Sequence, residues 1–262
     1  MQSKAQNSLG TILDDESHLY AQTKQVNQFF RRFNNEEDLE GNRSYPGDAD
    51  YRSESSRKMY LNLLFDKESS MMTMELKKEF MELVNDSDSP VFLDFHGDLW
   101  FAELAANFLQ NGNKESLMLF LQLEKENLGY KWAITNVYYD KFLKYFYKGD
   151  PQTINKSFLH PMSHELDFMN IRKIFKDPNY VEYYAANSFK PDYRTLLFYE
   201  IKKGNMEYES VGQLKFHFFQ VDGWYFEVAY FNRAGGNSGW LISKLYKLSE
   251  TEKNELIQFY LP

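Results

Sequence analysis

Histidines with neighbouring carboxylates supply the most suggestive chemistry in the sequence. The stretch 160–168 contains His160, His164, Glu165 and Asp167. Such side chains bind a metal when they converge. A zinc-protease helix needs a second His three residues after the Glu, where this chain has Phe168, and Pro161 interrupts a continuous helix face. We therefore expect a helix capped by Ser163 and no bound metal, and His164 stays a candidate for ligand contact.

His217 is the second candidate, because it lies in an alternating stretch. In residues 214–219, apolar side chains would occupy one face of a strand and Lys215, His217 and Phe219 the other. On the concave side of a curved sheet, such a His can act as a general base. The alternative, which we expect, is a partly exposed His with a structural role. Aromatic residues of neighbouring elements complete the set of ligand-contact candidates: His217, Tyr199, Trp224, Tyr225 and His164.

Composition limits the classes of function. The chain has 262 residues, a net charge of −8 and 18% aromatic residues. These values predict a folded, soluble protein and argue against a nucleic-acid partner, which would require clustered basic residues. The absence of Cys excludes disulfides, zinc–thiolate sites and Cys nucleophiles. No apolar run approaches the ~20 residues of a membrane span, and we expect no cofactor.

The compartment stays open at this stage. No signal peptide follows Met1, since the first residues are polar. The protein is cytoplasmic if Met1 is the native start, and exported if a signal peptide has been removed.

Helical periodicity and strand alternation predict the elements of the first half. Helices are expected at 18–33, 54–65 and 73–84, with a long polar loop at 34–53. Strands are expected at 91–95, 100–108, 117–124 and 130–137, followed by a short helix at 140–147. The alanines of 100–108 also fit a helix.

The second half begins after Lys148-Gly149-Asp150-Pro151, which predicts domains at 1–150 and 151–262. Helices are expected at 163–175 and 177–188, and a last helix at 249–260. Four strands are expected at 195–202, 208–220, 224–231 and 240–245. Trp240 is expected in the core, whereas Trp224 fits the core and a ligand site equally well.

The two halves share local sequence. Trp100-Phe101-Ala102-Glu103-Leu104 matches Trp224-Tyr225-Phe226-Glu227-Val228, and Trp132-Ala133-Ile134 matches Trp240-Leu241-Ile242. The two Trp stretches are farther apart in the first half, so a duplication requires an insertion there. The alternative is that twisted sheets favour aromatic residues. We predict two related copies, each with its own antiparallel sheet.

Gly239-Trp240-Leu241-Ile242 and Gly129-Tyr130-Lys131-Trp132-Ala133-Ile134 carry a resemblance to a known fold. With helices first and a curved antiparallel sheet after them, the chain resembles the nuclear transport factor two-like proteins, best over 155–262. The resemblance implies an α+β, cone-shaped fold, present in tandem, and no particular activity. Through residues 160–168, the whole chain is also similar to an uncharacterised bacterial family.

Two functions follow as hypotheses. The first is a non-enzymatic binding or interaction module, whose aromatic-lined sheet holds a small apolar ligand, a protein partner or a second copy in a homodimer. The second is a small-molecule isomerase, dehydratase or hydrolase that uses a His or carboxylate of the pocket. An apolar pocket favours the first, and a His or Asp beside another polar group in a deep pocket favours the second.

Overall fold

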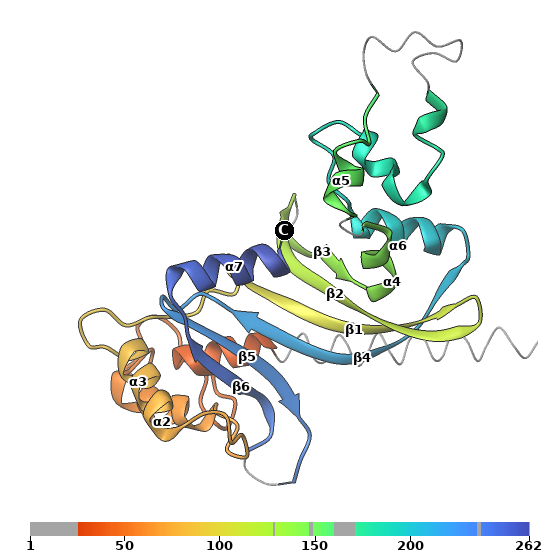
Figure 1. The fold of residues 1–262 in the computed structure, drawn as a ribbon. Helices are drawn as coiled ribbons and strands as arrows, with labels where there is room; N and C mark the ends of the chain where they lie inside the picture. Colours follow the sequence, from red (N-terminus) through yellow and green to blue (C-terminus); the bar gives the residue numbers. More distant parts are fainter. Residues whose placement is uncertain (1–25, 128, 147–148, 160–170, 235–236, 262) are drawn as a thin grey trace, which may run out of the picture. The chain divides into compact units, whose positions relative to one another are not determined.

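The structure is a computed structural model that describes residues 26–127, 129–146, 149–159, 171–234 and 237–261. Within these ranges the protein is an α+β fold with one open antiparallel sheet of six strands (Figure 1). The strand order is β3-β2-β1-β4-β5-β6. The strands are β1 (Trp100–Gln110), β2 (Asn113–Glu126), β3 (Gly129–Tyr138), β4 (Met206–Phe218), β5 (Trp224–Phe231) and β6 (Gly239–Lys247).

The helices lie before, between and after the strands. Residues 26–34 are helical and precede α2 (Glu54–Leu63) and α3 (Met74–Val84). Between β3 and β4 lie α4 (Asp140–Leu143), the 3₁₀ turns η1 (Lys144–Phe146), η2 (Ile171–Lys173) and η3 (Pro178–Tyr184), α5 (Pro151–Ile154) and α6 (Tyr193–Lys202). The last helix is α7 (Glu250–Tyr260), which Ser249 and Glu252 cap reciprocally.

The chain forms two compact units. The first unit contains residues 1–107, 119–136 and 209–262, and the second contains 108–118 and 137–208. The predicted domains, 1–150 and 151–262, stay predictions. The expectation of two separate sheets is wrong, because β1 and β4 are neighbours in a single sheet. A second copy of the fold is therefore not confirmed.

An aromatic core fills the space between one sheet face and the first three helices of the first unit. The helical stripe that the sequence predicts at residues 26–33 is buried, with Phe29 and Phe30 each 2% exposed. Alternate residues of the strands meet it, because successive side chains point to opposite faces. Phe218 and Phe226 stack there with ring centres 4.8 Å apart. The opposite face is covered by α7 (Figure 1).

Residues 91–95 are not a strand, which corrects the prediction. Their backbone groups bond to the end of α3 and to side chains instead of to a neighbouring strand. Val91 donates to the carbonyl of Val84 at 3.0 Å, and Leu93 donates to the Asn34 side chain at 2.8 Å. An apolar, β-prone sequence was therefore a guide to burial here and not to strand pairing.

Residues 195–202 belong to α6, so the strand predicted there is wrong as well. Asp192 begins the helix, since its carboxylate accepts from the backbone N–H of Arg194 at 3.0 Å and from the Thr195 hydroxyl at 2.8 Å. Such a cap satisfies donors that the first helical turn leaves free. The second half of the chain therefore contributes three strands in the described residues, and not four.

Candidate ligand-binding cleft

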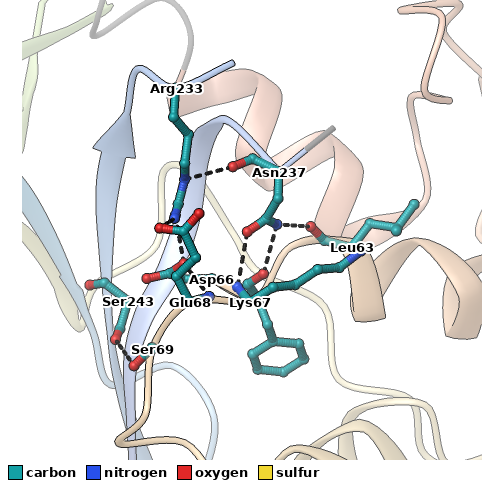
Figure 2. Close-up of polar contacts among 9 residues, drawn as sticks. Leu63, Asp66, Lys67, Glu68, Ser69, Arg233, Asn237 and Ser243 are labelled. Carbon is teal, nitrogen blue, oxygen red and sulfur yellow. Dashed lines mark hydrogen bonds and ion pairs between the residues drawn. The ribbon is translucent and has the colours of Figure 1, made fainter. Parts of the chain in front are cut away.

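The connection between β5 and β6 is fixed to the segment 64–69. Asn237 acts as a substitute for backbone: its side-chain oxygen accepts from the N–H of Lys67, and its amide donates to the carbonyl of Phe65, both at 2.9 Å (Figure 2). Arg233 donates to the Asn237 carbonyl at 2.9 Å and to Asp66 at 2.5 Å. These bonds hold Arg233 and Asn237 on the segment 64–69.

The same segment also pairs directly with β6. Ile242 donates to the carbonyl of Leu64 at 2.7 Å, and Asp66 donates to the carbonyl of Ile242 at 3.0 Å. The Ser69 hydroxyl reaches the Ser243 carbonyl at 3.4 Å (Figure 2). The start of β6 is therefore held on both sides, by β5 and by residues 64–69.

A cleft lies at this end of β6, within the first unit. Its volume is about 180 Å³. It is lined by Gln28, Phe29, Arg32, Leu64, Tyr230, Ser238, Gly239 and Trp240. Gly239 turns the chain there with φ +94°, a left-handed conformation that favours glycine.

Two donors in the lining have no hydrogen-bond acceptor among the described residues. Trp240 is 7% exposed, and its indole Nε1–H finds no acceptor among the described residues. The Nε–H of Arg32 is also buried without a hydrogen bond in that part of the chain. An unmade hydrogen bond of a buried donor costs ~1–3 kcal/mol, so such groups are rare in folded proteins. Two of them in the lining of one cleft indicate a place for an acceptor.

Glu37 does not supply that acceptor. It is 3% exposed, and its carboxylate binds Arg31 Nε at 2.7 Å and the Gln28 amide. Arg32 Nε lies 3.6 Å from Glu37 Oε1, which is too long for a hydrogen bond. Two guanidinium groups therefore share one carboxylate beside the cleft.

The other face of the sheet carries a polar cluster, which we define as Glu103, Lys215, His217, Tyr225, Glu227 and Lys244. His217 Nε2 lies 3.1 Å from Glu103 Oε2, and its Nδ1 lies 2.8 Å from the Tyr225 hydroxyl. Because an ionised carboxylate only accepts, Nε2 donates to Glu103. The expectation of a partly exposed His217 is wrong: the residue is 1% exposed, beneath α7 and the ring of Tyr260.

Electrostatics in the polar cluster favour the charged carboxylate. Burial alone would raise the pKa of Glu103, but the hydrogen bond and charge interaction with His217, together with Lys215, lower it overall. Burial raises the pKa of Tyr225, and the charge of Glu227 raises it further, so this phenol stays protonated. The cluster satisfies its own members and contributes no residue to the cleft.

A β-bulge in β6 explains why simple alternation assigns the side chains of the second half of this strand to the wrong faces of the sheet. Val228 pairs with Ile242 but Glu227 pairs with Lys244, so Ser243 is an extra residue on β6. The insertion turns Lys244 toward Glu227, whose carboxylate it binds at 2.6 Å, and Leu245 into the core. A one-residue change in register reverses the faces of every later side chain.

The structure brings together only some of the predicted site residues. His217 and Tyr225 meet in the polar cluster, and Trp224 is 2% exposed in the core, with its ring 5.2 Å from Phe80. Tyr199 lies on α6 in the second unit and is 55% exposed. His164 lies outside the described residues, as do His160, Glu165 and Asp167.

Sequence reasoning missed Arg32, Gln28 and Leu64 as lining residues. The available signal was a pair of adjacent arginines followed by glutamate. Only the folded chain shows that a single glutamate is buried there and which arginine its carboxylate binds. Trp240 was predicted to be buried, which is confirmed, yet it also lines the cleft.

The second unit contains a basic cleft of about 370 Å³. Its lining consists of Thr153, Lys156, Ser157, Lys173, Lys176, Asp177, Tyr180 and Tyr184. Lys173 Nζ is already held by the carbonyls of Lys156 and Phe158 at 2.8 and 3.0 Å. No lining atom there is a buried donor without a partner, so the cleft of the first unit is the stronger candidate.

Comparison with known proteins gives no information on function, which must therefore be inferred from this geometry. The chain matches no protein-family model, no curated protein and no solved structure. No three His, Asp or Glu side chains converge as metal ligands in the described ranges. None of the helices in those ranges has the length and apolar character that crossing a membrane requires.

Proposed function

We propose that the protein is a non-enzymatic binding module that holds a small molecule in the cleft beside Trp240. The observation that carries the proposal is the indole N–H of Trp240, buried and without an acceptor in the described residues. A ligand oxygen or nitrogen would complete that hydrogen bond. The protein would thus recover on binding the free energy that the unpaired donor costs on folding.

The backbone around the cleft supports a pre-formed site. Its walls come from the helical residues 26–34, the segment 64–69 and the strands β5 and β6. Asn237 and Arg233 fix the connection between those strands (Figure 2). Binding sites on rigid elements lose little conformational entropy when they take a ligand.

The enzymatic alternative receives less support. An isomerase, dehydratase or hydrolase would need a titratable side chain within reach of the substrate. His217 is 1% exposed, and both its ring nitrogens are bonded. Among the described residues that line the cleft, Arg32 is the only charged one, and a guanidinium carries hydrogen-bond donors and no acceptor.

The relationship to the nuclear transport factor two-like proteins, and the origin of the chain from two copies, remain proposals of the same kind. Helices packed on one face of an antiparallel sheet are compatible with that fold. The fold by itself specifies neither a ligand nor a reaction. The same holds for the similarity to a bacterial family.

The test uses the indole N–H resonances of ¹⁵N-labelled protein. The chain has four Trp residues, and Trp240→Phe identifies the signal of Trp240. We expect a screen of charged and neutral small molecules to find compounds that shift this signal. The signal of Trp100, whose N–H already donates to the carbonyl of Phe95 at 3.2 Å, serves as the internal control. A screen in which no compound moves the Trp240 signal selectively would refute the proposed site.

A further inference from the structure

We infer that the ligand of this cleft is a small organic carboxylate whose carboxylate binds Arg32. The inference rests on the proposed binding function and goes on to name the chemical class. It follows from the charges beside the cleft, the size of the cleft and the donors in its lining.

Charge is the first argument. Arg31 and Arg32 lie beside a single buried carboxylate, that of Glu37, whose shorter contact at 2.7 Å goes to Arg31. In the part of the chain that the structure describes, Arg32 makes no hydrogen bond from its Nε, and its side chain is 30% exposed. A guanidinium presents paired donors in a plane, which match the two oxygens of a carboxylate. A guanidinium with an unused donor selects an anion.

Size and surface are the second argument. The cleft of about 180 Å³ has an apolar side, formed by Phe29, Leu64 and Trp240, and a polar side, formed by Gln28, Arg32 and Ser238. An apolar cavity of roughly 150 Å³ accommodates one benzene molecule. The cleft therefore suits a single six-membered ring, or an aliphatic body of that size, with one carboxylate attached. Inorganic phosphate would bind only the polar side and would leave Phe29, Leu64 and Trp240 without a partner.

Trp240 supplies the third argument. Its N–H is shielded from solvent, and the ring of Tyr230 packs edge-on against it, with the ring centres 5.4 Å apart. Tyr230 is 41% exposed at the rim, so its side chain has room to turn outward. We expect a carboxylate held by Arg32 to accept the indole N–H with its second oxygen, because both residues line the cleft. Both unpaired donors of the cleft would be satisfied by one anionic group.

The probes are benzoate, its neutral analogue benzamide, and inorganic phosphate, titrated into the full chain and followed through the Trp240 indole signal and by calorimetry. We expect benzoate to bind and benzamide and phosphate to bind at least about tenfold more weakly, a difference of ~1.4 kcal/mol. Arg32→Gln should reduce benzoate affinity by about tenfold or more, as loss of a charged hydrogen bond does. Arg43→Gln removes an exposed positive charge that does not line the cleft and should change the affinity less than about twofold.

The outcomes separate the two proposals. If benzamide and benzoate bound equally well and Arg32→Gln had no effect, the inference that the ligand is a carboxylate would be wrong, but the proposed binding function would stand. Phosphate binding as tightly as benzoate would overturn the organic class. Arg32→Lys retains the charge with a compact ammonium, so it should recover part of the affinity, and it replaces Arg32→Gln if the latter fails to fold by circular dichroism. No shift of the Trp240 signal with any probe or screened compound would refute the proposed function itself.

Discussion

Arg57 shows how a single buried cation joins the helices of the first unit. It is 1% exposed, and its guanidinium donates to the carbonyls of Phe33 at 3.0 Å, of Val84 at 2.6 Å and of Val91. Phe33 and Val84 lie at the ends of their helices, where carbonyls lack intrahelical donors and the helix dipole is negative. Burial, followed by the charge of Arg52, lowers the pKa of Arg57 to about 10, so it remains charged at neutral pH.

Replacing Arg57 should destabilise the protein strongly. Arg57→Met removes the guanidinium donors from the carbonyls of Phe33, Val84 and Val91, of which only Val84 keeps another donor among the described residues, the N–H of Val91. We expect a loss of ~3–5 kcal/mol in the free energy of unfolding. Arg57→Lys keeps the charge but cannot reach all three carbonyls in one plane, so its loss should be smaller. Urea unfolding measures both. A Met variant within about 0.5 kcal/mol of the wild type would show that these bonds contribute no net stability.

The polar cluster makes stability depend on acid pH. The pKa of Glu103 is lowered in the folded protein, so its contribution is complete above the ordinary glutamate pKa of 4.5 and is lost as the pH falls through the folded value. Glu103→Gln should therefore lower the free energy of unfolding at about pH 7 and change it much less at about pH 3.

The matched control for Glu103 is Glu126, an exposed glutamate on β2 whose pKa is lowered by its hydrogen bond to Lys131. Exposed pairs contribute little to stability because solvent screens them. Glu126→Gln should hence leave the unfolding curves nearly unchanged at both pH values. If Glu103→Gln lowered stability equally at both, packing and not charge would explain the role of Glu103.

At the scale of elements, the predicted helices and strands of the first unit are largely confirmed. Regular alternation and long helical stripes are local, so residues 224–231 and 73–84 could be recognised from sequence. The wrong prediction at 91–95 has a non-local cause, because the backbone there bonds to the side chain of Asn34. The wrong prediction at 195–202 has a side-chain cause, because Asp192 caps a helix there. The sequence of a short apolar run does not distinguish a strand from a helix or a coil.

The cleft could not be predicted because its walls come from distant parts of the chain. Phe29 and Trp240 were predicted to be buried, but no sequence pattern placed them in one cleft. Leu64 reaches it because the segment 64–69 pairs with the backbone of Ile242 in β6, and the Asn237 side chain holds the same segment. No local sequence pattern predicts that the side chain of an Asn in a glycine-rich loop will bond to the backbone of a distant segment as a neighbouring strand would.

Asn237 should therefore control both the loop and ligand binding. Asn237→Ala removes the bonds to Lys67 and Phe65 and exposes two backbone groups, so we expect ~1–3 kcal/mol of destabilisation and weaker binding of benzoate. Ser69→Ala removes only the 3.4 Å bond to Ser243 and should have little effect on either. Unchanged binding in Asn237→Ala would mean that the cleft does not need this connection.

At the scale of the whole molecule, the Trp repeat gains a physical explanation from the sheet. The strands β1 and β5 are the two neighbours of β4. Trp100 and Trp224, one on each strand, are both buried in the aromatic core. Three residues further along each strand, Glu103 and Glu227 lie on the other face, within the polar cluster. Equivalent positions on either side of one central strand account for the motif without requiring two sheets.

Trp240 connects the stability of the whole first unit with binding. Its ring packs 5.0 Å from that of Phe216 and is 7% exposed. Trp240→Ala should cost ~3–5 kcal/mol, a large part of the ~5–15 kcal/mol that stabilises a domain, and lower the melting temperature sharply. Trp132→Ala, at a partly buried position of β3, should cost less.

Trp240→Phe separates the two roles. It keeps most of the apolar ring and removes an N–H that has no partner in the described residues, so the melting temperature should change little. Benzoate binding, which needs that N–H, should weaken by about tenfold. Calorimetric melting and titration of the same sample give both values. If Trp240→Phe melts as early as Trp240→Ala and binds benzoate like the wild type, the indole serves packing alone and the acceptor does not belong in this cleft.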